Sequence, residues 1–259
     1  LIVPDDAPDL PADVVRTFDG RFPNRFTAKG SDWRLGGSGY YRSDEDIDYG
    51  FLHELGHQLG LIDLYRLNLE RSQNKVTGQR YRWGDGLMCN VAPTLSEFSA
   101  RALDAWHGHR RGFYGQFLYD LPETVVLRLL DADGKPLARR PVAVYQKIMV
   151  PKQGEQLWPK PRFAGTTDAK GELALPNVPI DASRARPVAT GSVLRPNPWG
   201  HVACVGFNGL FLVEVDTSSG KLYRWLPITD ANLAYWRGHR SRAVLPLTMR
   251  PSGEKTKKE

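Results

Sequence analysis

Residues 53–63 read HELGHQLGLID, with two histidines four positions apart. Positions four apart lie on the same face of an α-helix, so His53 and His57 can direct their imidazoles at one metal ion. Glu54 is adjacent to the first histidine, on a neighbouring part of the helix surface. Its carboxylate can therefore reach a water molecule on that ion without being a ligand.

The residues that follow the histidines predict a third ligand. A catalytic zinc ion has three protein ligands and one open coordination position. Gly60 allows the chain to reverse direction after the helix, because glycine readily adopts left-handed backbone conformations. Asp63 follows three residues later, and we expect its carboxylate to join the two histidines. The pattern HExxHxxGxxD thus predicts one catalytic Zn²⁺, with Glu54 as the general base that takes a proton from water.

Other interpretations of this stretch stay open. His53 and His57 can be polar positions on an ordinary amphipathic helix. They can also belong to a closed structural zinc site, but such sites have four protein ligands and favour cysteine, and Cys89 is the only thiol nearby in sequence. Cys89 and the distant Cys204 either pair in an oxidising compartment or remain free thiols.

Two helices are predicted in the first 120 residues. In each, a capping-box pair precedes apolar residues that recur on one helical face. The first helix is expected over residues 44–59, after Ser43, and carries both histidines. The second is expected over residues 95–107, after Thr94. Residues 68–86 between them are polar and predict a long surface loop.

The pattern changes beyond Leu121. Apolar and polar residues alternate in short runs that are separated by turns containing Gly, Pro and Asp. We expect strands, with no helix among them, at residues 124–130, 141–147, 164–167, 172–175, 202–207, 210–215, 222–226 and 243–248. This number of short strands predicts an all-β sandwich over residues 121–250, followed by a disordered basic tail at 251–259.

The motif resembles the signature of the metzincin clan of zinc metallopeptidases. It is similar to the snapalysin and immune inhibitor A types, which have Asp as the third ligand. The clan has a turn containing Met beneath the metal, and Gly86-Leu87-Met88-Cys89-Asn90 is similar to that turn. The resemblance implies that Met88 packs under the ion without binding it. Two tyrosines, Tyr65 and Tyr81, are candidates for stabilising an oxyanion, with packing as the alternative role for both.

The resemblance implies a multidomain chain. Residues 1–120 would form an α+β zincin-like peptidase domain. Members of the clan place a multistranded sheet before the active-site helix, and 52 residues precede His53 here. The resemblance therefore implies either an N-terminally truncated domain or a reduced sheet.

The second half carries a resemblance of its own. Residues 125–144 read VVLRLLDADGKPLARRPVAV, and residues 164–176 read AGTTDAKGELALP. Both stretches resemble prealbumin-like or carboxypeptidase-regulatory-like modules, which are Ig-like β-sandwiches that accompany secreted enzymes. Such a module implies contact with a surface or a polysaccharide, or shielding and orientation of the peptidase.

Composition excludes several classes of protein. The apolar share of 41% is sufficient for a buried core, and no run approaches the roughly 20 apolar residues that span a membrane. The net charge is +6, but basic and acidic residues are interleaved, so we expect no nucleic-acid partner. We expect a zinc endopeptidase acting on proteins or peptides, which the resemblance places outside the cytoplasm. The alternative is a non-catalytic binding or adhesion protein whose sandwich carries the function, with the peptidase-like part a relic or a structural zinc site.

Overall fold

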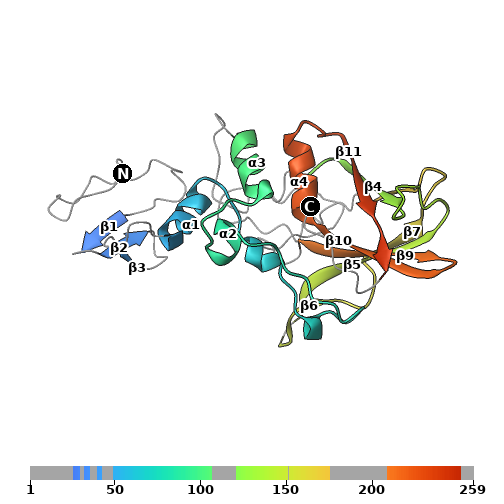
Figure 1. The fold of residues 1–259 in the computed structure, drawn as a ribbon, viewed down its shortest axis with the longest axis horizontal. Coiled ribbons are helices and arrows are strands. Elements are labelled where there is room, and N and C mark those ends of the chain that lie inside the picture. The colour runs from blue at the N-terminus through green and yellow to red at the C-terminus, as the bar shows by residue number, and fades with distance from the viewer. Residues whose placement is uncertain are drawn as a thin grey trace, which may run out of the picture.

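A computed structural model describes residues 26–29, 32–35, 40–42, 49–106, 121–150, 152–175 and 209–251. Figure 1 shows three parts in succession: a small sheet, a group of short helices and a β-rich part. The small sheet is antiparallel and consists of β1 (Phe26–Lys29), β2 (Asp32–Leu35) and β3 (Tyr40–Arg42) in that order. It precedes the helix that carries the two histidines.

The two predicted helices lie close to their expected positions, as α1 (Tyr49–Gln58) and α3 (Glu97–Trp106). Three short helices between them were not predicted: the 3-10 helices η1 (Leu64–Leu67) and η2 (Arg71–Gln73), and α2 (Leu87–Asn90). Residues 43–48, where the first helix was expected to begin, lie outside the described residues. The cap of α3 is Ser96, whose Oγ accepts a hydrogen bond of 3.1 Å from the amide of Ser99. The predicted cap, Thr94, therefore lies outside the helix.

The second half forms two sheets. They contain β4 (Thr124–Leu130), β5 (Pro141–Val150), β6 (Gly154–Leu157), β7 (Phe163–Thr166), β8 (Glu172–Ala174), β9 (Leu210–Thr217), β10 (Gly220–Pro227), β11 (Arg242–Thr248) and β12 (Arg250–Pro251). The larger sheet has the order β12-β10-β9-β5-β6, with β7 also paired to β5, and the smaller has the order β11-β4-β8. Alternate residues of both sheets enter one hydrophobic core, so the predicted β-sandwich is confirmed.

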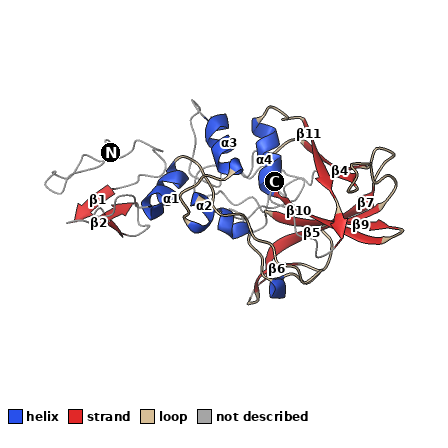
Figure 2. Ribbon diagram, viewed as in Figure 1, coloured by secondary structure: helices blue, strands red, loops and turns tan. Residues whose placement is uncertain are grey.

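The second half differs from the prediction in several elements. Strands β6 and β12 were not predicted, and β12 includes Pro251, which was expected to begin the disordered tail. The strand expected at 202–207 and the rest of the tail lie outside the described residues. The expectation of no helix is wrong, because α4 (Ile228–Trp236) lies between β10 and β11. Strand β11 pairs with β4 in parallel. Parallel strands cannot be joined by a tight turn, and the long connection between these two includes α4. Figure 2 shows α4 beside α3, and the rings of Phe98 and Trp236 have centroids 6.0 Å apart.

One hydrophobic core extends across the domain boundary that we predicted near residue 120. Leu61, Leu64 and Met88 from the first segment belong to the same buried cluster as Val125 and Phe211 from the sandwich. A second, smaller cluster joins residues of both segments on the outer face of the larger sheet: Leu69, Leu157, Leu210 and Leu212. Among the described residues, the helical segment is thus packed onto the sandwich. No described helix is long and apolar enough to cross a membrane.

Candidate metal centre

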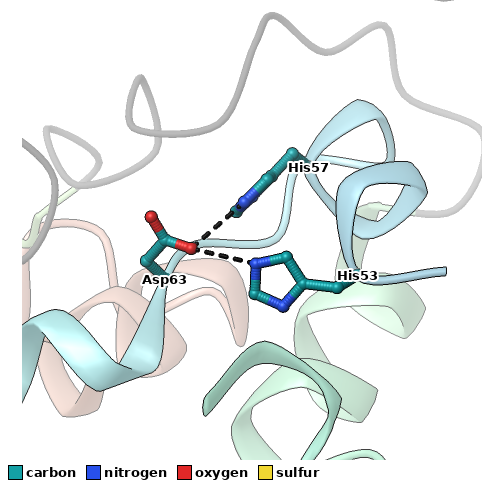
Figure 3. A group of neighbouring side chains, drawn as sticks. All are labelled: His53, His57 and Asp63. Atoms are coloured by element: carbon teal, nitrogen blue, oxygen red, sulfur yellow. Dashed lines mark hydrogen bonds and ion pairs between the residues drawn. The ribbon is translucent and has the colours of Figure 1, made fainter. Parts of the chain in front are cut away.

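The structure brings the three predicted ligands together. Figure 3 shows the imidazoles of His53 and His57, both from α1, directed at the carboxylate of Asp63. The Nε2 atoms of His53 and His57 lie 3.2 Å and 3.1 Å from Oδ1 of Asp63. All three side chains are buried, with exposed fractions of 7%, 5% and 5%. Two nitrogens and one oxygen therefore meet at one buried point.

A tight turn at the end of α1 makes this meeting possible. Gly60 has a φ of 90°, a left-handed conformation that favours glycine. The amide of Gly60 donates to the carbonyl of His57 at 2.9 Å, and the amide of Leu61 donates to the carbonyl of Gly56 at 2.9 Å. These two bonds form the Schellman arrangement that ends many helices. The chain then runs back along the helix, and Asp63 reaches the histidines as the N-cap residue of η1.

The second nitrogen of each imidazole has a backbone partner. His53 Nδ1 lies 2.7 Å from the carbonyl oxygen of Leu87, and His57 Nδ1 lies 3.0 Å from that of Leu61. A carbonyl can only accept a hydrogen bond, so Nδ1 carries the proton in both rings. In a neutral imidazole, Nε2 then has only a lone pair, and it faces the lone pairs of Asp63 Oδ1. A cation or protons must lie between these atoms.

The donor set fits a zinc ion. Bonds of about 2.0–2.1 Å in a tetrahedral arrangement place ligand atoms about 3.3 Å apart. The two distances from the histidine nitrogens to Asp63 Oδ1, 3.2 Å and 3.1 Å, are close to this value, and all three ligand atoms lie within 4.8 Å of one another. Backbone carbonyls on Nδ1 are the outer partners that metal-binding histidines commonly have. Within the described part of the chain, no fourth Cys, His, Asp or Glu joins the group. Three protein donors are the number in an open catalytic zinc site, whereas a closed structural site has four.

The charges of the three groups are strongly linked. Burial alone would lower the pKa of His53, but its hydrogen bonds with Asp63 and with the carbonyl of Leu87 raise the pKa overall. Burial alone would raise the pKa of Asp63, but hydrogen bonds with His53 and His57 lower it well below its usual range. A raised histidine pKa means that protons compete with a cation for these atoms. Metal binding there therefore weakens as the pH falls.

The other carboxylate oxygen of Asp63 is held by its neighbours. The hydroxyl of Tyr65 donates to Oδ2 at 3.0 Å, and Arg66 Nε lies 3.9 Å from the same oxygen. These contacts leave Oδ1 for the imidazoles. The hydroxyl of Tyr65, a candidate for oxyanion stabilisation, is thus bonded to the predicted metal ligand Asp63. Arg66 was not among the residues predicted for the site.

The two remaining candidates for reaction chemistry lie in different places. Glu54 is half-buried on α1, and its charge helps to raise the pKa of His53. Tyr81 packs its ring against Trp225, with centroids 5.2 Å apart, and its backbone pairs with Leu69. Burial raises the pKa of Tyr81. These contacts give Tyr81 a packing role, whereas Glu54 lies beside the site.

The turn with Met88 lies against α1. Met88 is buried, and a Cβ atom placed on Gly56 would be 2.7 Å from its Sδ atom. The same short helix, α2, supplies the carbonyl of Leu87 to His53. Cys89 follows as a half-buried free thiol, and Cys204 lies outside the described residues. The segment therefore packs against the helix, as predicted for Met88, and it also orients one imidazole through Leu87, which was not predicted.

Replacement of Gly60 by Ala is expected to destabilise the protein by about 1 kcal/mol, because a side chain is strained at a φ of 90°. It is also expected to lower zinc affinity, since the turn positions both Asp63 and the carbonyl of Leu61. Gly78→Ala is the matched control: Gly78 also has a positive φ, of 67°, and a Cβ atom there would meet no atom within 4 Å. Thermal unfolding and zinc titration of both variants test this. Equal zinc affinities would contradict the role of the turn.

Comparison with known proteins does not identify a family for this chain. No protein-family model matches the chain, and no curated protein matches it. A structure of transthyretin from Sparus aurata is 18% identical, over 48% of this chain and 87% of its own, with a TM-score of 0.22. Sea bream transthyretin in complex with thyroxine is 18% identical, over 51% and 98%, with a TM-score of 0.23. The assignment of the sandwich rests on its sheets and core.

Proposed function

We propose that this chain is a zinc-dependent endopeptidase that hydrolyses peptide bonds in protein or peptide substrates outside the cytoplasm. Residues 1–120 would correspond to a zincin-like α+β peptidase part. One observation carries the proposal: the Nδ1 atoms of His53 and His57 both face carbonyls, so their Nε2 lone pairs converge on Asp63 Oδ1. This arrangement favours a metal site over two polar positions on an amphipathic helix.

His53, His57 and Asp63 would hold the ion. Zinc supplies Lewis acidity, which polarises a carbonyl and makes a nearby water more acidic. Glu54 would take a proton from the attacking water as the carbonyl carbon forms its new bond to oxygen. When the C–N bond breaks, Glu54 would return that proton to the leaving nitrogen. Tyr65 and Arg66 would keep the Asp63 carboxylate oriented throughout.

Metal content and proteolysis of the purified chain test the proposal together. We expect one zinc ion per chain by elemental analysis, and cleavage of casein or gelatin that a zinc chelator abolishes and added zinc restores. One bound zinc without any cleavage would instead support the non-catalytic binding protein. Absence of specific zinc binding would overturn the metal site itself.

A further inference from the structure

A lysine of the sandwich is buried beside the segment that carries the third ligand. Lys147, in β5, is 0% exposed. Its Nζ donates to the carbonyl of Arg66 at 2.5 Å and to that of Asn68 at 3.1 Å, and it forms an ion pair with Glu155. Burial of an ammonium group is costly unless it is paired and hydrogen-bonded. Both requirements are met here by residues of two segments that lie far apart in the sequence.

The two carbonyls are at the end of η1, the helix that begins at Asp63. The last carbonyls of a helix have no partner within it, and a cation at that end is favourable. Asn68 is the C-cap residue of η1, and the amide of Arg66 donates to the carbonyl of Asp63 at 3.3 Å. Lys147 thus holds the far end of a single helical turn whose near end is the ligand.

The chain beyond η1 is attached to the same edge of the sandwich. The amide of Lys75 donates to the carbonyl of Leu157, in β6, at 3.4 Å. Asn74, which forms a bridge with Leu157, also holds the following turn. Its Oδ1 accepts hydrogen bonds from the amides of Val76 and Thr77, and its Nδ2 donates to Thr77 Oγ1 and to the carbonyl of Gln79. Leu69 and Leu157 share one buried cluster. Strands β5 and β6 therefore fix the segment on the C-terminal side of Asp63.

The two histidine ligands and the aspartate ligand are held in place by different parts of the chain. His53 and His57 are fixed relative to each other by one helix, whereas Asp63 follows a turn and depends on how η1 is held. A metal site needs ligand positions accurate to about 0.2 Å. We infer that Lys147 is a positioning residue for the metal site, which holds Asp63 at the distance that metal binding requires. This inference rests on the proposed metal site and gives the sandwich a part in it.

Zinc titration of Lys147→Met tests the inference. The methionine side chain nearly fills the same space but has no ammonium group. We expect zinc affinity to fall about tenfold, as for loss of an outer partner of a metal ligand. We also expect the visible spectrum of the Co²⁺-loaded protein to change, because the Asp63 oxygen shifts. Leu129→Ala is the control: Leu129 is 0% exposed and lies in β4, in the other sheet. It should lower stability and leave the affinity and spectrum of the folded protein unchanged.

A second variant covers the case in which Lys147→Met does not fold. Glu155 has a side chain that is 19% exposed, so Glu155→Gln should fold. It removes the charge partner of Lys147 and leaves the two carbonyl bonds in place, so we expect zinc affinity to fall by less than for Lys147→Met, with a change in the same direction in the cobalt spectrum. Folded variants with the affinity and cobalt spectrum of the original chain would overturn the inference alone. An original chain that binds no zinc would overturn the metal site as well.

Discussion

Replacement of Glu54 by Gln is expected to lower peptide hydrolysis by about a thousandfold while one zinc ion per chain stays bound. General acid–base catalysis by a placed side chain contributes about 10²–10⁴ in rate, and an amide cannot take the proton. Zinc binding should persist because His53, His57 and Asp63 form the donor group without Glu54. The measurement is kcat on a fluorogenic peptide, with zinc content determined on the same sample.

The matched control for Glu54→Gln is the same substitution on α3. Glu97 is exposed, pairs with Arg101 one helical turn away and lies outside the donor group. Glu97→Gln should keep the original rate and zinc content. If Glu54→Gln retains full activity with zinc bound, Glu54 is not the general base. If it loses zinc, the residue acts on the metal site and its role in the proton transfer must be abandoned.

Replacement of Asp63 by Ala is expected to lower zinc affinity by at least about a hundredfold, and hydrolysis should be lost with the metal. Loss of an outer partner alone costs about 10–100-fold in affinity, and Asp63 is a direct ligand in our proposal. The change also leaves the Tyr65 hydroxyl and Arg66 without their acceptor. Competition with a chromophoric zinc chelator measures the affinity.

An exposed aspartate on α3 provides the control for Asp63→Ala. Asp104 lies outside the donor group, so Asp104→Ala should bind zinc like the original chain. If His53 and His57 are only polar positions on an amphipathic helix, Asp63→Ala and the original chain will show the same weak affinity. Such a result would remove the basis of the proposed enzyme.

Some of the fold was missed although the sequence carries a signal for it. The helix α4 follows Pro227, has Asp230 in its first turn and buries Ile228, Ala231 and Ala234 on one side. This is helical spacing, but nine residues between two strands are too few to distinguish a helix from a loop. Lys147 stands in the run VAVYQKIMV, where one lysine interrupts an otherwise mostly apolar strand. That interruption is the only local sign of its buried contacts.

The sequence by itself determined the local geometry of the candidate site. His53 and His57 meet because a helix places positions four apart on one face, and Asp63 returns to them because Gly60 accepts a left-handed turn. The alternation of apolar and polar residues likewise predicted most of the individual strands, although not which of them pair. In these cases backbone geometry acts within about ten residues, so spacing alone is sufficient.

Only the tertiary structure decided what holds that geometry in place. The carbonyl of Leu87 that orients His53 lies 34 residues away, and Lys147 lies 81 residues from the carbonyl of Arg66 that it binds. The hydrophobic core that includes both Met88 and residues of the sandwich was equally invisible in the sequence. These contacts depend on which surfaces pack together after the chain has folded. Sequence spacing does not indicate which surfaces will pack together, because that packing depends on the shapes and polar groups of segments far apart in the chain.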